Sequence, residues 1–394
     1  MQKKITLLGG TGTIGKNTVS IVKDNPEKYS IETIIANKNV EELSKIAIEV
    51  GAKNVVIADE SKYEKLKGLL GDSGIKLFAG DVEVNNLASE KTDLFVSGAV
   101  GFCALKPTMA AIKAGSKIGL ANKECLVCAG DLMMGAAKRN AAQIIPIDSE
   151  HNSIYQVFDF DRVDQIEKIT LTASGGPFRS FTNEQMRNVT PEMAVKHPNW
   201  DMGKKISVDS ATMMNKGLEV IEAYYLFPIE KNQIDILVHP ESIIHGLVSY
   251  KDGSTLAGLS SPDMKVPIAY ALAHPERVST TAGRINLTEV GSLTFEKPDL
   301  EKFKCLKIAL NALDVGQNCA IALNASNEVS VASFLDGKIS FQHIAEITER
   351  TIEEIEKNTS NKVSDFEEIF DIDLSARRFA ESQIEILNNN RAAG

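Results

Sequence analysis

The stretch Lys3–Val22, KKITLLGGTGTIGKNTVSIV, decides the fold class of this chain. It begins as a short predicted strand that runs into a glycine-rich turn, where Gly10, Gly12 and Gly15 match the pattern G-x-G-x-x-G. A helix is predicted from about Lys16. In this strand–turn–helix context, glycines let the backbone approach a pyrophosphate, and the helix N-terminus offers it free N–H groups. The simpler alternative is a glycine turn that only connects a strand to a helix.

Strand-like and helical stretches alternate from this turn to about residue 148. Further strands are predicted at YSIETIIAN, NVVIAD, KLFAG, LFVSGAV, SKIGLAN and AQIIPID, with helices between them. The alternation predicts an α/β fold with a doubly wound, Rossmann-like parallel sheet, which binds its ligands beyond the carboxyl ends of the strands. Because Asn122, Lys123 and Glu124 follow one such end, we expect them to contact a cofactor or a substrate.

The end of the second strand indicates which dinucleotide binds. An NAD site usually carries Asp or Glu at this point, for the ribose hydroxyls. This chain has Asn37, Lys38 and Asn39 instead. A cation and two amides suit a 2′-phosphate better than a diol, so the sequence favours NADPH over NADH.

Composition narrows the class of protein. The chain has 394 residues, of which 43% are hydrophobic, so it is long enough for two or three domains. Its net charge of −10 argues against a nucleic-acid partner, which requires a concentrated basic patch. No apolar run is long enough to predict a signal peptide or a membrane span. Cys125 and Cys128 form a CxxC without the second pair of a zinc site, so we expect reduced cysteines and a cytoplasmic protein.

Carboxylates at the end of the last strand of this sheet indicate a metal site. Asp148 and Glu150 are two residues apart and would point to one side if the extended geometry continues. Two such carboxylates repel each other unless a cation or a proton lies between them. With Glu219 they would supply three oxygen ligands, a set that suits Mg²⁺ or Mn²⁺, with Co²⁺ as a further candidate. An ordinary acidic strand end is the alternative, and His151 is expected beside the ligands rather than among them.

A second group of polar residues lies in the stretch 196–219, KHPNWDMGKKISVDSATMMNKGLE. The segment KISVD predicts a strand, and a helix is expected after it with Ser210 at its N-terminal end. On that helix, Asn215 and Glu219 are i,i+4 and Lys216 and Glu219 are i,i+3, so the three share one face. Two donors beside a carboxylate predict a ligand with a phosphate at one end and a metal at the other. A solvated helix face with a surface salt bridge is the alternative.

The rest of the chain predicts two further domains. Ser174 opens a glycine turn, SGGPFR, whose hydroxyl and N–H groups suit a phosphate, and it follows a predicted strand, EKITLTAS. Strands are also predicted at QIDILVHP, IHGLVSY and STLAGLS. The predicted divisions are an NADP-binding domain at 1–148, a central α+β catalytic domain at 149–275, a linker at 276–299 and a helical bundle at 300–394.

The motifs GGTGTIG, ANKE, PIDSEHN, SGGPFR, KHPNWDMGKKISVDSATMMNKGLE, HPESIIHG and SPDM together resemble those of the 1-deoxy-D-xylulose 5-phosphate reductoisomerase family, almost from end to end. The resemblance implies an enzyme that uses NADPH and a divalent metal to convert this sugar phosphate into 2-C-methyl-D-erythritol 4-phosphate for isoprenoid synthesis. The reaction is usually written as retro-aldol cleavage, re-aldolisation and hydride transfer. A homodimer is also implied. The family typically begins with LGSTGSIG, so Gly10 and Thr13 stand here in place of serines, a change expected to alter cofactor affinity at most.

Motif positions and the resemblance together assign roles to individual residues. The metal ligands are Asp148, Glu150 and Glu219. The substrate contacts are Ser149, Glu150, Ser174, His197, Ser210, Asn215, Lys216 and Glu219, and the residues expected to act in catalysis are Lys123, Glu150, His197 and Trp200. The cofactor contacts are Thr11, Gly12, Thr13, Ile14, Asn37, Lys38, Asn39, Asn122, Glu124, Gly203 and Met264. Trp200 and Met202 are implied to belong to a lid at about 190–203, which keeps an aldehyde intermediate from water.

Two other functions compete with this interpretation. An NADP-dependent semialdehyde dehydrogenase would use a cysteine nucleophile such as Cys103 or Cys125. It would lose activity when that cysteine is replaced by Ala but not in Glu219→Ala. A nucleotide-sensing module would bind NADPH without turning over a sugar phosphate, but three converging carboxylates are hard to explain in a sensor.

Overall fold

The computed structural model describes residues 2–196, 200 and 202–393. The chain forms two compact units, each built from separate stretches of sequence. The first unit contains Met1–Cys125, Met133–Gln156 and Asp263–Ile285. The second contains Leu126–Leu132, Val157–Pro262 and Asn286–Gly394. Each unit is described by itself below.

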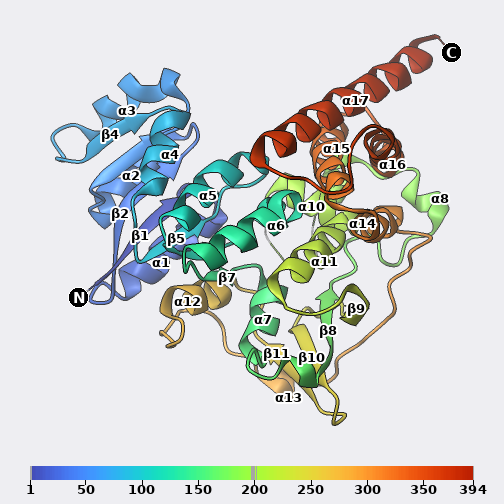
Figure 1. Cartoon of the computed structure of the whole chain (residues 1–394), viewed down its shortest axis with the longest axis horizontal. Helices are drawn as coiled ribbons and strands as arrows, with labels where there is room; N and C mark the ends of the chain where they lie inside the picture. Colours follow the sequence, from blue (N-terminus) through green and yellow to red (C-terminus); the bar gives the residue numbers. More distant parts are fainter. Residues whose placement is uncertain (1, 197–199, 201, 394) are drawn as a thin grey trace. The chain divides into compact units, whose positions relative to one another are not determined.

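The first unit is organised around a seven-stranded sheet in which all neighbouring strands run parallel, in the order β4-β3-β2-β1-β5-β6-β7 (Figure 1). The strands are β1 Lys3–Leu8, β2 Tyr29–Ala36, β3 Asn54–Ile57, β4 Lys76–Ala79, β5 Leu94–Ser97, β6 Lys117–Leu120 and β7 Ile144–Pro146. The helices between and after them are α1 Thr13–Asp24, α2 Val40–Val50, α3 Tyr63–Leu70, α4 Asp81–Ser89, α5 Leu105–Lys113, α6 Lys123–Arg139, α7 Ser149–Val157 and α12 Lys265–Ala273. The predicted doubly wound sheet is therefore confirmed.

The core of this unit explains why the alternating sequence folds in this way. Ile5 and Leu7 of β1 are fully buried, and apolar residues of β2, β3 and β5 pack beside them. Helix α12 follows far along the chain, yet Ile268 and Leu272 belong to the same core. Burying one such side chain contributes roughly 1.5–3 kcal/mol. Consecutive strands lie to one side of β1 up to β4 and to the other side from β5 onward, so the strand order reverses at β1 and β5, where such sheets bind ligands.

The second unit contains a four-stranded mixed sheet in the order β11-β10-β8-β9. Strand β10 runs antiparallel to β8 and β11, whereas β8 and β9 are parallel. The strands are β8 Ile166–Ala173, β9 Ile234–Val238, β10 Ile244–Tyr250 and β11 Thr255–Leu259. The helices of this part are α8 Asn183–Met186, α9 Pro191–Ala194, α10 Lys204–Ala211, α11 Met214–Leu226 and α13 Leu287–Val290.

Four helices complete the second unit, as the sequence predicts for its C-terminal part (Figure 1). They are α14 Lys304–Val315, α15 Gln317–Leu335, α16 Phe341–Asn358 and α17 Phe366–Ala393. Gly316 separates α14 from α15. Helix α15 is buried along most of its length, and it packs against α16, α17 and α10. No helix in the described part of the chain is both long and apolar enough to cross a bilayer.

Two local predictions are wrong in the same place. KISVD, predicted as a strand, lies in helix α10. Ser210 does not begin a helix but lies in the last turn of α10, and α11 begins at Met214. The alternation of Ile206 and Val208 imitates a strand, but buried Val208 and Ala211 lie at helical spacing, so tertiary packing overrides the local pattern.

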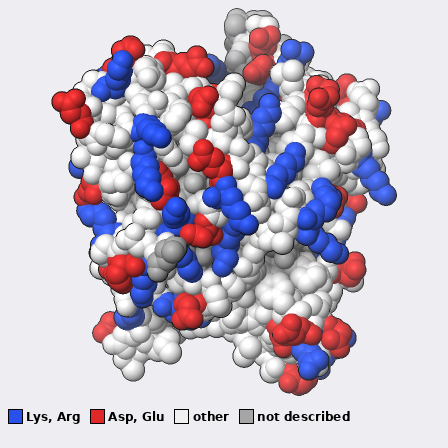
Figure 2. All heavy atoms as spheres, turned by 60° about the vertical axis from the view of Figure 1, so that its left-hand side comes forward, with Lys and Arg blue, Asp and Glu red and all other residues white. Residues whose placement is uncertain are grey.

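Charged side chains of both signs are interleaved on the face drawn in Figure 2. Several pairs within the first unit form salt bridges, such as Lys16 with Glu42 at 3.0 Å. The Lys16 side chain is 54% exposed, and exposed pairs of this kind contribute about 0–1 kcal/mol each. The apolar cores therefore account for stability more than the surface charges do.

Candidate active site

The turn after β1 has the shape that a dinucleotide fingerprint requires. Gly9 has a φ of 85°, and a Cβ atom there would lie 2.6 Å from the backbone nitrogen of Ala99, in the turn after β5. A Cβ atom on Gly15 would lie 2.4 Å from the carbonyl oxygen of Gly10. Helix α1 begins directly after Gly12, which offers no side-chain cap to its first N–H groups. These N–H groups are thus available to an anion, and Thr11, Thr13 and Ile14 lie at the same turn.

The residues predicted to bind a 2′-phosphate lie directly after β2. Asn37 and Lys38 are exposed. Asn39 is also exposed, but its Oδ1 accepts a hydrogen bond from the N–H of Glu42 at 3.2 Å and caps α2. Lys38 lies close enough to Asp59 to lower the pKa of that carboxyl, after the larger effect of hydrogen bonding by Ser61. Lys38 therefore provides an exposed cation at the end of β2, whereas Asn39 is committed to the helix.

Asn122 organises the ends of β5 and β6. Its Oδ1 accepts from the N–H of Cys125 at 2.9 Å and caps α6. Its Nδ2 donates to the carbonyls of Ala99 and Gly101 at 2.6 and 2.8 Å. The side chain is 2% exposed and all its hydrogen-bonding groups are used within the protein. Asn122 thus positions the loop after β5 and the start of α6, where Lys123 and Glu124 follow.

The acidic residues after β7 lie beside a buried ammonium group. Lys123 is 5% exposed, and its Nζ lies 2.5 Å from Oδ2 of Asp148. The Nδ1 atom of His151, which is fully buried, lies 3.4 Å from Oδ1 of Asp148. Ser149 donates from Oγ to Oε2 of Glu150 at 2.6 Å. The first unit therefore brings together Lys123, Asp148, Ser149 and Glu150, as the sequence predicts.

Asp148 and Glu150 lie close together, but through a different backbone geometry from the extended one that we expected. The extended geometry does not continue past β7, because helix α7 begins at Ser149 and the N–H of Asn152 bonds the carbonyl of Asp148 at 2.9 Å. Even so, a carboxylate oxygen of Asp148 and one of Glu150 lie within 4.8 Å of each other. Oxygen ligands of this kind and spacing fit a hard divalent cation. The third predicted ligand, Glu219, belongs to the second unit.

In the second unit, two predicted phosphate-binding segments touch. Ser174 follows β8, and its Oγ accepts from the N–H of Gly176 at 3.2 Å. Gly175 and Gly176 have φ values of 79° and 69°, so both backbones are left-handed. A Cβ atom on Gly176 would lie 2.5 Å from the carbonyl oxygen of Ser210. Only glycine allows this approach, which places the serine turn against the end of α10.

Asn215, Lys216 and Glu219 share one face of α11, as predicted. Nδ2 of Asn215 lies 2.5 Å from Oε1 of Glu219, and Nζ of Lys216 forms an ion pair with Oε2 of the same carboxylate. Lys216 is 3% and Glu219 is 1% exposed. The alternative of a solvated surface salt bridge is therefore wrong. Buried charges in such a place are usually paired or bound to a ligand.

The lid residues are described only in part. His197 lies outside the described residues, as do Pro198, Asn199 and Asp201. Trp200 is half-buried, and its ring meets that of His245 edge to face with 6.2 Å between the centroids. His245 is 4% exposed, and its Nε2 lies 3.2 Å from the carbonyl oxygen of Ser260. Sequence analysis gave no role to His245, although it lies within the quoted motif HPESIIHG.

The remaining predicted contacts lie at helix starts. Gly203 precedes α10, and its carbonyl accepts from both the N–H and the Oγ of Ser207, at 3.1 and 3.0 Å. Met264 precedes α12 and is partly buried against the core of the first unit. Glu124, in the first turn of α6, is 6% exposed.

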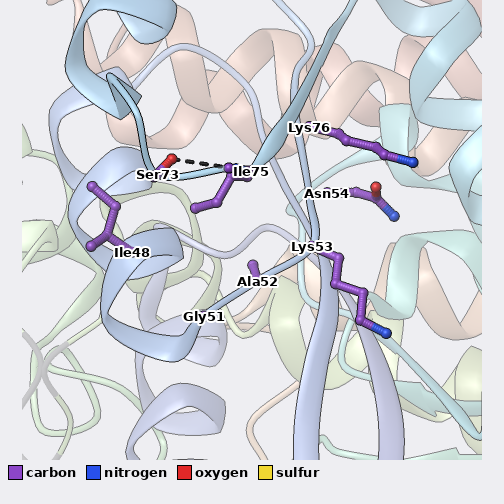
Figure 3. A pocket seen from close by; sticks show the side chains of 9 residues that line it. Ile48, Gly51, Ala52, Lys53, Asn54, Ser73, Ile75 and Lys76 are labelled. Carbon is purple, nitrogen blue, oxygen red and sulfur yellow. Dashed lines mark hydrogen bonds between the residues drawn. The ribbon is translucent and has the colours of Figure 1, made fainter.

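A hollow of about 530 Å³ in the first unit lies away from these residues (Figure 3). Lys53 and Asn54 line it at the start of β3, and Lys76 lines it at the start of β4. The predicted cofactor residues follow the opposite, carboxyl ends of the strands. The hollow is therefore not the predicted dinucleotide site.

Family models match three consecutive parts of the chain. The model of 1-deoxy-D-xylulose 5-phosphate reductoisomerase matches residues 5–130. The model of the 1-deoxy-D-xylulose 5-phosphate reductoisomerase C-terminal domain matches residues 144–227. A DXP reductoisomerase C-terminal domain model matches residues 259–379.

Curated proteins and solved structures are similar over almost the whole chain. The 1-deoxy-D-xylulose 5-phosphate reductoisomerase of Rhodospirillum centenum is 44% identical over 97% of this chain and 94% of its own length. That of Chlorobaculum tepidum is 47% identical over 89% of this chain and 92% of its own. The structure of the Zymomonas mobilis enzyme in complex with NADPH superposes with a TM-score of 0.91 at 42% identity, covering 98% of this chain and all of that one. A structure of DOX-P reductoisomerase with NADPH, fosmidomycin and magnesium gives a TM-score of 0.93 at 41% identity, over 98% of this chain and 99% of that one.

Proposed function

The chain belongs to the 1-deoxy-D-xylulose 5-phosphate reductoisomerase family, and from this premise we propose which of its residues carry out the reaction. It is an enzyme of the non-mevalonate isoprenoid pathway that converts 1-deoxy-D-xylulose 5-phosphate into 2-C-methyl-D-erythritol 4-phosphate with NADPH and Mg²⁺. The observation that carries the residue assignment is the buried Asn215–Lys216–Glu219 face of α11, because no surface role explains two buried charges there.

The metal would be held by Asp148 and Glu150 of the first unit and by Glu219 of the second. Their carboxylate oxygens are the ligands that Mg²⁺ and Mn²⁺ prefer. A divalent ion bound there supplies a Lewis acid for a hydroxyl and a neighbouring carbonyl of the substrate. Lys123 compensates the charge of Asp148, and Ser149 fixes the orientation of Glu150 through its hydrogen bond.

The phosphate of the substrate is proposed to bind between the serine turn and α11. Ser174 and Ser210 offer hydroxyls, Asn215 offers an amide, and Lys216 offers the positive charge. The Gly176 approach to Ser210 supports this grouping within the second unit. His197 is assigned to the same end of the substrate by the family motif. Binding energy at the phosphate would hold the reacting carbons in place at the other end.

NADPH is proposed to bind along the carboxyl ends of β1, β2, β5 and β6. Thr11, Gly12, Thr13 and Ile14 supply the pyrophosphate turn, and Lys38 pairs with the 2′-phosphate. Asn37 and Asn39 lie beside Lys38, although Asn39 also caps α2. Asn122 acts by ordering this edge, and Glu124, Gly203 and Met264 are proposed to contact the nicotinamide half. Gly10 leaves the turn intact where the family typically has serine.

Trp200 and Met202 are proposed to cover the substrate as part of a lid at about 190–203. Covering the site would exclude water from the aldehyde that receives the hydride. The edge contact of Trp200 with His245 is proposed to be its resting position, from which it moves when a substrate binds.

A homodimer that pairs along β11 is also proposed, in a cytoplasmic enzyme. β11 ends the four-stranded sheet, and Leu256 and Leu259 on it are 49% and 42% exposed. The opposite edge is different, because Glu296 bridges to Val238 of β9. An apolar strand edge suits pairing with a second copy. Sedimentation of Leu256→Lys and Leu259→Lys variants tests the dimer, which should dissociate. Four buried thiols fit a reducing compartment.

The decisive test is NADPH oxidation in the presence of 1-deoxy-D-xylulose 5-phosphate, with and without Mg²⁺ and a chelator. We expect turnover that requires the metal and survives replacement of Cys103 or Cys125 by Ala. Turnover that depends on a cysteine and not on Glu219 would favour a semialdehyde dehydrogenase. NADPH binding without any turnover would favour a sensor.

A further inference from the structure

A buried hydrogen bond ties the C-terminal helices to the segment between α10 and α11. Nδ2 of Asn327, on α15, donates to Oδ1 of Asp209 at 2.8 Å, across 118 residues of sequence. Asn327 is fully buried and Asp209 is 1% exposed. Nζ of Lys205 lies 2.8 Å from the other oxygen, Oδ2. Among the described residues, Asn327 thus holds one oxygen of this carboxylate and Lys205 the other, and removing either donor would weaken the hold on a buried oxygen.

Asp209 lies where the chain turns from α10 into α11, a segment that we call the elbow (209–214). Oγ1 of Thr212 donates to the carbonyl of Asp209 at 3.2 Å and accepts from the N–H of Met214 at 3.2 Å. Met213 has a φ of 58°, which is uncommon for a residue other than glycine. Such a conformation is strained and persists only when its surroundings fix it.

One proposed phosphate ligand lies within the elbow, and two others follow it directly. Ser210 follows Asp209 directly, and its carbonyl meets Gly176 of the serine turn. Asn215 and Lys216 lie in the first turn of α11, just after the elbow. A shift of the elbow would move these groups together. Because a binding site must hold its groups to within about 0.5 Å, the position of Asp209 controls how well they converge on one anion.

We propose that Asn327 is a positioning residue for the substrate phosphate, acting through Asp209. It does not touch the ligand; it sets the place of the elbow from a helix that the sequence predicts only as part of a bundle. Oδ1 of Asn327 has no hydrogen-bond partner among the described residues, so its amide is oriented by the bond it donates to Asp209. A carboxylate at 327 would place like charges together, and an alanine would leave Oδ1 of Asp209 without its donor.

The inference rests on the proposed phosphate site, and the test separates the two. In wild-type enzyme and in Asn327→Asp, the KM values for 1-deoxy-D-xylulose 5-phosphate and NADPH and the inhibition constant of inorganic phosphate are measured at saturating Mg²⁺. We expect the sugar-phosphate KM and the phosphate inhibition constant to rise about tenfold or more, with the NADPH KM within twofold of wild type. Ser210→Ala tests the phosphate site directly. If Ser210→Ala changes neither the sugar-phosphate KM nor the inhibition constant of inorganic phosphate, the proposed phosphate site is wrong.

Asn318→Asp provides the matched control. Asn318 lies on the same helix and is equally buried, but its Nδ2 donates to Oγ1 of Thr359 at 3.0 Å, away from the elbow. We expect this variant to lose thermal stability without a change in the sugar-phosphate KM. The double variant Asp209→Asn/Asn327→Asp restores one donor and one acceptor and should recover part of the lost affinity. If Asn327→Asp does not fold, Asn327→Ser replaces it.

Three results would overturn the proposal. One is an unchanged sugar-phosphate KM in a folded Asn327 variant when Ser210→Ala raises it. Another is an equal rise in Asn318→Asp, which would show a general effect of burying a charge in α15. The third is a double variant with no better phosphate affinity than Asn327→Asp alone.

Discussion

Replacing Glu219 by glutamine separates the structural role of its charge from its proposed role as a metal ligand. Glu219 accepts a hydrogen bond from Asn215 and pairs with Lys216, and both charged side chains are almost fully buried. Glu219→Gln keeps the size of the side chain but removes the carboxylate charge that pairs with the ammonium group of Lys216.

The expected cost follows from burial. Removing one partner of a buried ion pair typically costs about 3–5 kcal/mol, because an uncompensated charge remains. A domain has roughly 5–15 kcal/mol of stability, so the variant should be clearly destabilised but still folded. Lys216→Met in the same chain removes the other charge of this pair. Replacing a buried pair by apolar side chains is often neutral, so the double variant should regain most of the stability.

Turnover should not recover in the double variant as stability does. We expect Glu219→Gln to lose several orders of magnitude in turnover and the double variant to stay inactive, because neither regains the carboxylate. Unfolding in urea without Mg²⁺ gives the stabilities, and NADPH oxidation with the sugar phosphate gives the rates. Asp148→Asn should also lose turnover, as a ligand from the first unit.

Two outcomes would refute the reasoning. Near-normal turnover of Glu219→Gln, or of chelator-treated enzyme, would remove this carboxylate from the metal site. Equal stability of the wild type and Glu219→Gln would mean that the buried pair contributes nothing, contrary to its burial.

Three further predictions concern other parts of the molecule. Lys38→Ala should narrow the preference for NADPH over NADH by about tenfold or more, since a hydrogen bond to a charged group is worth about 1.5–3 kcal/mol; equal efficiency of both cofactors in the wild type would contradict the assignment. Trp200→Ala should lower turnover strongly with little change in thermal stability. In the wild type, the fluorescence emission of this single tryptophan should change when a substrate analogue binds with NADPH and metal. An unchanged spectrum together with a wild-type rate for Trp200→Ala would mean that the ring contributes only packing. Burial raises the pKa of the Cys305 thiol from 9.0 to about 12, so its contribution to stability is complete below pH 9 and falls as the pH rises toward 12, by about 2 kcal/mol at pH 10.5. Cys305→Val should remove this part of the decrease in unfolding free energy with pH, measured by urea unfolding. An identical pH dependence in the wild type and the variant would exclude a contribution from this thiol.

The parallel sheet of the first unit could be predicted from the sequence because its information is local. Each strand is a short apolar run bounded by turn residues, and the parallel sheet follows from the repetition. The fingerprint around Gly12 and the cation at Lys38 are likewise contained in a few adjacent residues. The helical face of Asn215, Lys216 and Glu219 also needed only the period of a helix.

The predictions failed where distant residues decide the local structure. KISVD has the alternation of a strand, but it forms α10, with Val208 buried and Asp209 bonded to Asn327. Met213 has a left-handed backbone conformation, which the sequence does not predict because no glycine stands at this position. The sequence also does not reveal that the side chain of Asn122, which stays a predicted cofactor contact, orders two loop carbonyls and a helix start. Positioning residues of this kind leave no pattern that a short window can detect.

The charged side chains of the proposed site are paired with one another within each unit. Asp148 is compensated by Lys123 in the first unit, and Glu219 by Lys216 in the second. A buried charge without a partner would cost several kcal/mol, so these internal pairs stabilise the buried charges. A bound cation would take the place of the ammonium groups beside the carboxylates, and a bound phosphate would take the place of the carboxylate beside Lys216. Since Glu219 and Lys216 release each other in that exchange, each ligand reduces the cost of binding the other, and the metal and the sugar phosphate should bind cooperatively.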